Sequence, residues 1–149
     1  MKVHEVMTQH PVCCHAGDTA QAVAKLLRDA DVGSMPVIGK SGRLEGIITD
    51  RDLCCSIVAE GLDPTATSIR DFIKKDPIGC RGEQSLDSCE RLMQTHQIRR
   101  IPVIDGDGYC IGIVSQADLV RSEPSDKVHQ TIAEISKPSR TLIVPPLAS

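Results

Sequence analysis

The chain has 149 residues, 40% of them hydrophobic and 25% charged, and its formal net charge is -3 at pH 7. This length and composition are enough for an ordinary globular core. The acidic balance, with one Phe, one Tyr and no Trp, argues against a general binder of nucleic acid or anionic membranes, because such proteins need clustered basic side chains or aromatic rings that stack on bases.

No apolar run approaches the ~20 residues that span a bilayer, and no signal-peptide core follows residues 1–5. We therefore expect a cytoplasmic protein without a membrane partner. The sequence also contains no Ser-His-Asp order, no H-E-x-x-H and no Gly-rich phosphate loop, so we do not expect an enzyme.

The first half of the chain predicts short strands that alternate with helices. Thr19 follows a Gly-Asp turn and precedes apolar residues at helical spacing, so it is expected to cap a helix. Turn signals at residues 40–43 separate two apolar runs, which indicates a hairpin, and Thr49 or Asp50 caps the helix that follows. The expected elements are strands at residues 12–14, 35–38 and 44–48, and helices at about 19–30 and 50–59.

The second half repeats this order after a connector. Residues 61–68 combine glycine, proline, aspartate and hydroxyl residues, which are typical of a connecting segment. A second run of turn residues at 105–108 again indicates a hairpin. The expected elements are a helix capped by Ser85, strands at 101–104 and 109–114, and a short amphipathic helix between Pro124 and Pro138.

The strongest feature of the sequence is an internal repeat. Residues 6–53 align on residues 72–119 without an insertion, and 11 of the 48 pairs are identical. The identities concentrate on a Pro-Val-Ile strand and on the corner where a strand meets a helix, at residues 46–52 and 112–118. Each corner combines a hydroxyl residue, an aspartate three positions later and free backbone N–H groups, which suits a polar small molecule.

Two β-α-β-β-α units of this size each leave an apolar sheet face uncovered, so we expect them to pack on each other. The expected fold is α/β (α+β), with two repeats that are related by a pseudo-twofold axis and form one module. The expected boundaries are 1–60 for the first repeat, 61–68 for the connector, 69–122 for the second repeat and 123–149 for a C-terminal helix and tail.

The Pro-Val-Ile hairpin followed by Gly-Ile-Ile-Thr-x-x-Asp-Leu or Gly-Ile-Val-Ser-x-x-Asp-Leu resembles a tandem pair of CBS (cystathionine-beta-synthase-like) domains, over residues 1 to about 122. Residues 49–52 and 61–64 are most similar to small stand-alone bacterial pairs of the stress or hypoxic-response kind. The resemblance implies a regulatory, non-catalytic module of signal transduction and energy sensing. It would bind an adenine nucleotide such as AMP, ADP, ATP or NAD in the cleft between its units.

The resemblance also implies which residues would bind this ligand. Asp52 and Asp118 would accept the ribose hydroxyls, since a carboxylate offers two acceptor oxygens. Thr49 and Ser115 would lie near the ribose and phosphate. The adenine slot would be lined by Thr8, Pro11, Val12 and Met35 in one site, and by Lys74, Pro77, Ile78 and Ile101 in the other. As alternatives, the aspartates and hydroxyl residues could be plain first-turn carboxylates and N-caps.

The two copies differ just before the proline-bearing strand, where the second copy has Arg99-Arg100 and the first has residues 33–34, Gly-Ser. In related pairs, basic residues at these positions contact phosphates. We therefore expect phosphate charge to be met mainly by Arg99, Arg100 and Arg51, and the two sites not to be equivalent. The alternative is that Arg99 and Arg100 are solvated residues at a helix end.

Seven cysteines invite a metal or disulfide interpretation, but none forms C-x-x-C, and adjacent pairs point in opposite directions on a strand. We interpret them as reduced thiols used as small hydrophobes. A disulfide, or a zinc site assembled across the fold with His4, His10 or His15, remains the alternative.

The competing function is a structural or dimerisation protein whose cleft is empty or holds a metal through Cys and His. An enzyme acting on nucleotides is a third hypothesis, and the sequence shows no evident nucleophile and base for it.

We expect a homodimer that packs segments 50–59 and 116–122 through Leu53, Ile57 and Leu119, and a protein partner that the sequence does not identify. The apolar residues 142–144 predict either a disordered tail or a segment that docks on a partner subunit.

Overall fold

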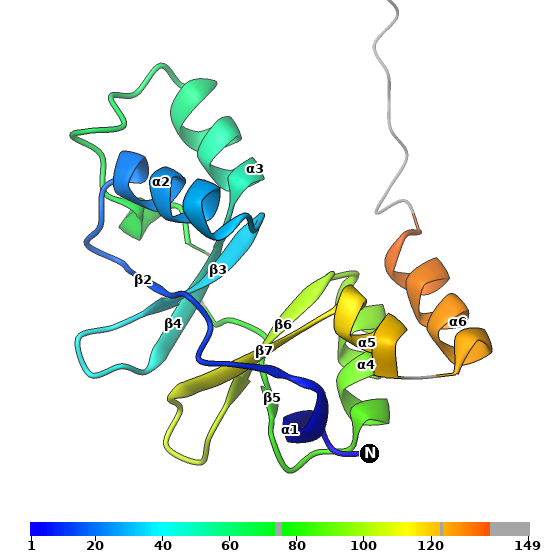
Figure 1. Ribbon diagram of the computed structural model, residues 1–149. Helices are drawn as coiled ribbons and strands as arrows, with labels where there is room; N and C mark the ends of the chain where they lie inside the picture. Colours follow the sequence, from blue (N-terminus) through cyan, green and yellow to red (C-terminus); the bar gives the residue numbers. More distant parts are fainter. Residues whose placement is uncertain (74–75, 123, 138–149) are drawn as a thin grey trace, which may run out of the picture.

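The computed structural model describes residues 1–73, 76–122 and 124–137. Figure 1 shows two similar units, each built from a small sheet and its helices, which meet along their sheets. This arrangement confirms the predicted mixed fold of two repeats. Lys74 and the tail at 138–149 lie outside the described residues, and so do the predictions made for them.

The first unit has a three-stranded sheet in the order β2-β3-β4. Strand β2 runs parallel to β3, and β3 runs antiparallel to β4. Helix α3 continues directly into one π-helical stretch, so the predicted helix at 50–59 is present but changes its hydrogen-bond pattern part-way. The elements are β2 (Cys14–His15), α2 (Ala20–Ala30), β3 (Ser34–Ile38), β4 (Leu44–Thr49), α3 (Asp50–Leu53), the π-helical stretch Cys54–Val58 and the 3-10 helix Ile69–Asp71.

The second unit has a four-stranded sheet in the order β1-β7-β6-β5. Its strands β5, β6 and β7 repeat the pairing of β2, β3 and β4, and both hairpins carry a register shift at the equivalent place. The elements are α1 (Val3–Val6), β1 (Thr8–Gln9), β5 (Cys80–Arg81), α4 (Leu86–His96), β6 (Arg100–Ile104), β7 (Cys110–Ser115), α5 (Gln116–Ser122) and α6 (Ser125–Ile135). None of the described helices is both long and apolar enough to cross a bilayer.

The internal strands β3 and β6 each carry a proline, which is tolerated only where its missing N–H breaks no ladder. The thiols of Cys14 and Cys80 donate to the carbonyls of Pro36 and Pro102 at 3.8 and 3.9 Å. A residue's carbonyl and amide nitrogen point to the same side of a strand. The proline nitrogens therefore face β2 and β5, whose pairing begins one residue after each proline.

The two repeats exchange their first segments. Val3 is fully buried in the core of the second unit, and β1 pairs with β7 in the register Thr8 to Ile113. Ile69, at the start of the second repeat, is buried in the core of the first unit. The packed units are therefore intertwined, and their boundaries differ from those of the sequence repeats.

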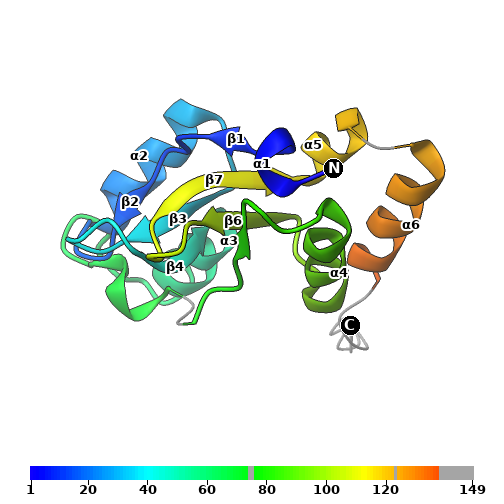
Figure 2. The same ribbon diagram turned by 90° about the horizontal axis from the view of Figure 1, so that it is seen from below.

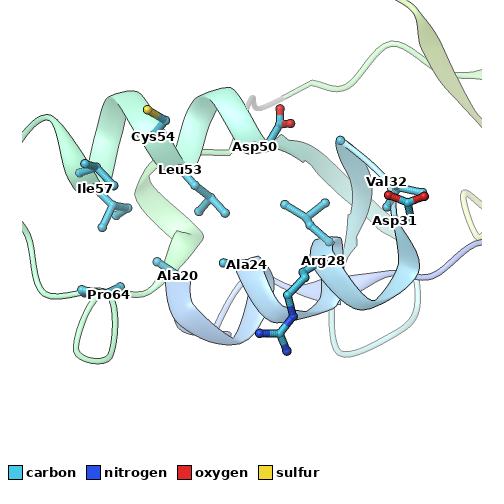
Figure 3. Close-up of a pocket in the computed structure, with 13 residues that line it drawn as sticks. Ala20, Ala24, Arg28, Asp31, Val32, Asp50, Leu53, Cys54, Ile57 and Pro64 are labelled. Atoms are coloured by element: carbon cyan, nitrogen blue, oxygen red, sulfur yellow. The ribbon is translucent and has the colours of Figure 1, made fainter.

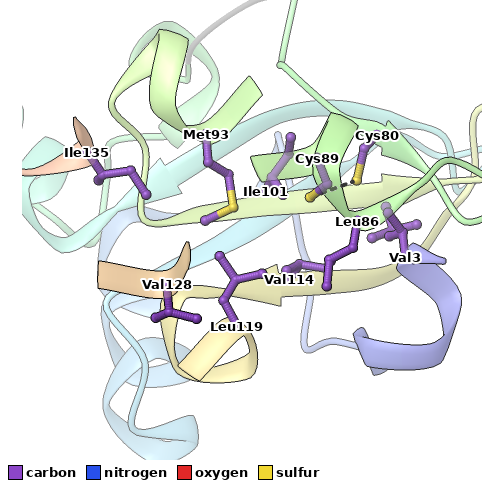
Figure 4. Packing of buried hydrophobic residues seen from close by; sticks show 11 residues of the cluster. Val3, Cys80, Leu86, Cys89, Met93, Ile101, Val114, Leu119, Val128 and Ile135 are labelled. Carbon is purple, nitrogen blue, oxygen red and sulfur yellow. Dashed lines mark hydrogen bonds between the residues drawn. The ribbon is translucent and has the colours of Figure 1, made fainter. Parts of the chain in front are cut away.

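Each unit has its own hydrophobic core, and Figure 4 shows the core of the second.

Helix α6 packs against α4 and α5 of the second unit, at the outer edge of the molecule in Figure 2. Its Thr131 is 1% exposed. The Thr131 hydroxyl donates to Glu90 Oε2 and accepts from Gln94 Nε2, each at 2.9 Å. The predicted amphipathic helix is thus confirmed, and buried polar contacts hold it to α4.

Candidate functional site

A cleft of about 1050 Å³ lies between the two units. The first unit contributes the start of β3, the end of β4 and α3. The second unit contributes the segment before β5 and the turn that leads from α4 into β6. The lining residues are Gly33, Ser34, Ile47, Thr49, Asp50, Arg51, Asp52, Asp76, Pro77, Ile78, His96, Gln97, Ile98, Arg99 and Arg100. This volume lies at the upper end of the range of small-molecule sites.

The corner of the first unit presents Thr49 and Asp52 to this cleft. The two residues cap each other: Asp52 N–H donates to Thr49 Oγ1 at 3.0 Å, and Thr49 N–H donates to Asp52 Oδ2 at 3.0 Å. This reciprocal pair fixes the side chains at the start of α3. Both side chains remain partly exposed, so the aspartate can accept hydrogen bonds from a ligand at its second oxygen.

The opposite wall begins with Pro77 and Ile78, both half-buried. The residue before the proline, Asp76, has a φ of 55°, and the equivalent residue of the first repeat, His10, has a φ of 50°. A left-handed backbone at a residue other than glycine costs on the order of 1–3 kcal/mol. The same left-handed residue before both prolines fixes the direction in which the Pro-Ile and Pro-Val segments leave the turn, and this direction places Pro77 and Ile78 in the cleft lining.

Arg99 and Arg100 reach the cleft because α4 ends in a left-handed turn. Gln97 has a φ of 52° and closes the helix through its N–H, which donates to Gln94 O. The chain then passes through the exposed Arg99 into β6, which begins at Arg100. The cleft therefore contains guanidinium groups from both units, since Arg51 belongs to α3.

The charges of the cleft are mixed. Its lining contains three arginines, at positions 51, 99 and 100, and three aspartates, at positions 50, 52 and 76. Arginine forms bidentate hydrogen bonds to phosphate, whereas a carboxylate accepts hydrogen bonds from hydroxyl groups. The lining therefore suits a molecule that carries both an anionic group and hydroxyl groups.

The equivalent corner of the second unit has a different set of contacts. Ser115 N–H and Ser115 Oγ both donate to Asp118 Oδ2 at 2.7 Å. Arg121 Nη2 donates to Asp118 Oδ1 at 2.6 Å. Asp118 is only 5% exposed. Both of its oxygens are thus occupied by groups of the protein.

The structure brings together seven of the predicted site residues from both copies: Thr49, Arg51, Asp52, Pro77, Ile78, Arg99 and Arg100. The corner of one repeat therefore faces the slot of the other. Thr8 pairs with Ile113 on β7, two residues before Ser115. The predicted slot of the first repeat therefore lies on the side of the second corner. This slot also includes Pro11 and Val12, which is 47% exposed.

Three predicted residues are placed elsewhere or not described. Met35 and Ile101 are 1% and 0% exposed and are part of the two cores rather than of the cleft lining. Both side chains point into a core from β3 or β6. The sequence pattern alone does not distinguish such a core position from a position that lines the adenine slot. Lys74 is outside the described residues. Asp50, Asp76 and His96 also line the cleft but are not among the predicted site residues, although the first two are neighbours of predicted residues.

A second concavity of about 590 Å³ lies on the first unit, between α2 and the α3 segment (Figure 3). Leu53, Ile57 and Val58 line this groove. Val58 is exposed, whereas the predicted dimer residues Leu53 and Ile57 are 9% and 3% exposed and belong to the core of the first unit, so little of their surface is left for a dimer contact. On the second unit the equivalent helices, α4 and α5, are covered by α6. Leu119 is accordingly fully buried, so the prediction that it forms a dimer surface is wrong.

All seven cysteines are free thiols. Burial raises the pKa of the Cys14 thiol to about 12. The buried thiols of Cys80 and Cys89 lie 3.7 Å apart, marked by the dashed line in Figure 4. Among the described residues, no group of three or more His, Cys, Asp or Glu side chains could hold a metal ion.

Comparison with known proteins identifies the repeat. The family profile for the CBS domain matches residues 3–58 and 69–125. Hypoxic response protein 1 of Mycobacterium tuberculosis is 31% identical over 134 residues, which cover 90% of this chain and 93% of that protein.

Two solved structures show the same fold. Hypoxic Response Protein I with two coordinated zinc ions superposes with a TM-score of 0.77 at 31% identity, covering 83% of this chain and 100% of that chain. CBSX2, a CBS-pair protein from Arabidopsis thaliana, superposes in its complex with AMP with a TM-score of 0.72 at 25% identity. That match covers 81% of this chain and 94% of the other.

Proposed function

Because the chain belongs to the CBS-domain family, we propose that it is a non-catalytic regulatory module that binds an adenine nucleotide in the cleft between its units. The observation that carries this proposal is the meeting of Thr49 and Asp52 of one repeat with Arg99 and Arg100 of the other in one cleft. The complex of CBSX2 with AMP supports the same class of ligand.

In the proposed complex, the ribose hydroxyls donate to Asp52, whose Oδ2 is already oriented by Thr49 N–H. The base lies against Pro77 and Ile78, where the lining is apolar. The phosphate is bound by guanidinium groups of Arg99 and Arg100, with Arg51 on the near wall. Each part of the nucleotide then meets a matching group, and the ligand contacts both units at once.

A ligand that contacts both units shifts their relative arrangement only by as much as it prefers one arrangement over another. We propose that this preference is the signal that a protein partner reads, as in energy sensing or a stress response inside the cytoplasm. The N-terminal segment of the first repeat packs on the second unit. A change in the relative position of the cleft walls would therefore move residues of both units.

Thermal melting of the pure protein with AMP, ADP, ATP, NAD or S-adenosylmethionine tests this function. A ligand at 100 times its dissociation constant should stabilise the fold by ~2.7 kcal/mol. The stabilisation should be lost in Asp52→Asn, which keeps the side-chain volume. If no adenine compound shifts the melting temperature at millimolar concentration, the proposed function is wrong.

The alternative is a structural or dimerisation protein, with a metal site formed by Cys and His. The two zinc ions coordinated in Hypoxic Response Protein I are the observation that favours a metal. A melting shift with zinc, without any shift by adenine compounds, would support this alternative. Metal analysis of the purified protein distinguishes the two further.

We also propose that the protein is a homodimer. The apolar groove between α2 and the α3 segment carries exposed Val58, and Leu62 nearby is 41% exposed. Burying this face against a second copy would remove apolar surface from water. Light scattering at micromolar concentration should give the mass of two chains, and Val58→Asp should give the mass of one.

A further inference from the structure

The second corner of the molecule contains the same hydroxyl and carboxylate pair as the first but is closed by the protein itself. Asp118 Oδ2 accepts from Ser115 N–H and Oγ, and Asp118 Oδ1 accepts from Arg121 Nη2 at 2.6 Å. The guanidinium therefore occupies the oxygen that a ribose hydroxyl would need. Charge-assisted bonds of this length are among the stronger hydrogen bonds of proteins.

The two corners differ at the position three residues after the aspartate. The second repeat has Arg121, and the equivalent residue of the first repeat, 66 positions earlier, is Cys55. Cys55 is exposed and cannot form an ion pair with Asp52. At the first corner, Asp52 is partly exposed, and its carboxylate accepts a hydrogen bond from the described residues only at Oδ2, from Thr49 N–H.

The second corner nevertheless retains the composition of a binding site. The side-chain nitrogen of Gln116, which follows Ser115, is buried and has no hydrogen-bond partner among the described residues. Buried polar groups without a partner are rare in proteins and call for an explanation. The second corner therefore holds a polar group that the described residues leave without an acceptor.

We propose that Arg121 keeps the second site closed, so that each chain binds one nucleotide, at Asp52. This inference rests on the proposed function and adds the choice between the two sites. Arg121 is a specificity-determining residue in this proposal, because it competes with the ligand for Asp118. Its side chain is 69% exposed, so the guanidinium can swing away without disturbing the core.

Isothermal titration calorimetry with AMP and with adenosine tests the proposal. The wild-type protein should bind one AMP per chain, and Arg121→Ala should bind two. Adenosine should show the same gain of one site, because Asp118, the group that Arg121 occupies, would accept hydrogen bonds from ribose hydroxyls rather than bind the phosphate. The double variant Arg121→Ala with Asp118→Asn should return to one AMP.

The reciprocal variant tests the same idea at the first corner. Cys55→Arg places a guanidinium three residues after Asp52 and should weaken AMP binding about two- to fivefold. Cys55→Met, which has no charge, is the matched control and should leave AMP binding unchanged. Thermal melting of each variant without ligand checks that the fold is retained, as expected for changes at two exposed positions.

The outcomes separate this inference from the proposed function. Two equal sites in the wild type, or a single site that persists in Arg121→Ala, would overturn the role of Arg121 while leaving nucleotide binding intact. No binding of AMP or adenosine by the wild type or by Arg121→Ala would overturn both. Loss of all binding in Arg121→Ala would show that the guanidinium holds the ligand rather than excluding it, and would overturn the inference.

Discussion

Thr49 and Asp52 cap each other at the start of α3, each side chain accepting the other's backbone N–H at 3.0 Å. The same atoms that begin the helix therefore orient the carboxylate toward the cleft. A cap of this kind contributes ~1 kcal/mol to stability, so structure and binding depend on the same two residues.

The two roles can be separated by substitution. Asp52→Asn keeps an oxygen that can accept Thr49 N–H, so it should change the melting temperature little while weakening AMP binding, because the charged acceptor of the ribose is lost. Thr49→Ala removes the helix cap and should lower the free energy of unfolding by ~1 kcal/mol. Chemical denaturation and calorimetry measure the two effects. Equal loss of stability in both variants would contradict the separation.

The arginines of the second repeat should recognise the phosphate. Arg100→Ala is expected to weaken AMP and ATP more than adenosine, because only the nucleotides carry the charge that the guanidinium binds. Loss of one charge-assisted bond corresponds to ~1.5–3 kcal/mol, which is roughly 10-fold to 150-fold in affinity.

The control for this measurement is Arg28→Ala, which changes an arginine of the α2 groove outside the cleft lining. It should leave both ligands unaffected. An equal loss of adenosine and AMP in Arg100→Ala would show that the residue shapes the cleft rather than binding phosphate.

Local signals predicted most of the fold. The caps Thr19, Thr49 and Ser85 each accept the expected backbone N–H, because capping depends on residues within one turn. Strand β1 was not predicted, since its two residues gain their structure by pairing with Ile113 and Gly112, more than 100 positions away. Helix α1 was not predicted either, because Val3 is buried only by the other unit.

The sequence predicted which residues form the candidate site but not how they are arranged in space. The repeat identified Asp52 and Pro77 as candidates, yet only the fold shows that they face the same cleft from different repeats. Met35 has the spacing of a slot residue, but the pleat of β3 directs it into the core. Arg121 carried no signal in the sequence, because a basic residue in the last turn of a helix is ordinarily solvated.

Helix α6 should be held to the second unit by its buried hydroxyl. Thr131→Val keeps the shape of the side chain but removes both the donor to Glu90 and the acceptor for Gln94. Losing these two hydrogen bonds should lower the free energy of unfolding by ~1–3 kcal/mol, which thermal or urea denaturation measures.

Thr65→Val is the matched control for this variant, because the Thr65 hydroxyl bonds to Asp63 Oδ1 on the exposed connector. Its effect should stay within ~0.5 kcal/mol. If the two variants were equally stable, the contact between α4 and α6 would contribute nothing beyond apolar packing.

The cysteines should fall into two classes of reactivity. Cys54 and Cys55 are exposed, whereas Cys14 is 1% exposed and burial raises its pKa to about 12. The thiolate is the reactive form, and at pH 8 a thiol with this pKa is ionised in only ~1 molecule in 10,000. Iodoacetamide at pH 8 should therefore modify Cys54 and Cys55 well before Cys14.

Mass spectrometry of peptides after timed labelling measures these rates. Cys14 should remain unmodified in the folded protein and react fully in guanidinium chloride. Because its pKa is raised in the folded state, the contribution of this thiol to stability is complete below pH ~8.5, the ordinary thiol pKa. The contribution is lost as the pH rises toward 12. Rapid labelling of Cys14 at pH 8 without denaturant would show that β2 opens from β3 in the native state.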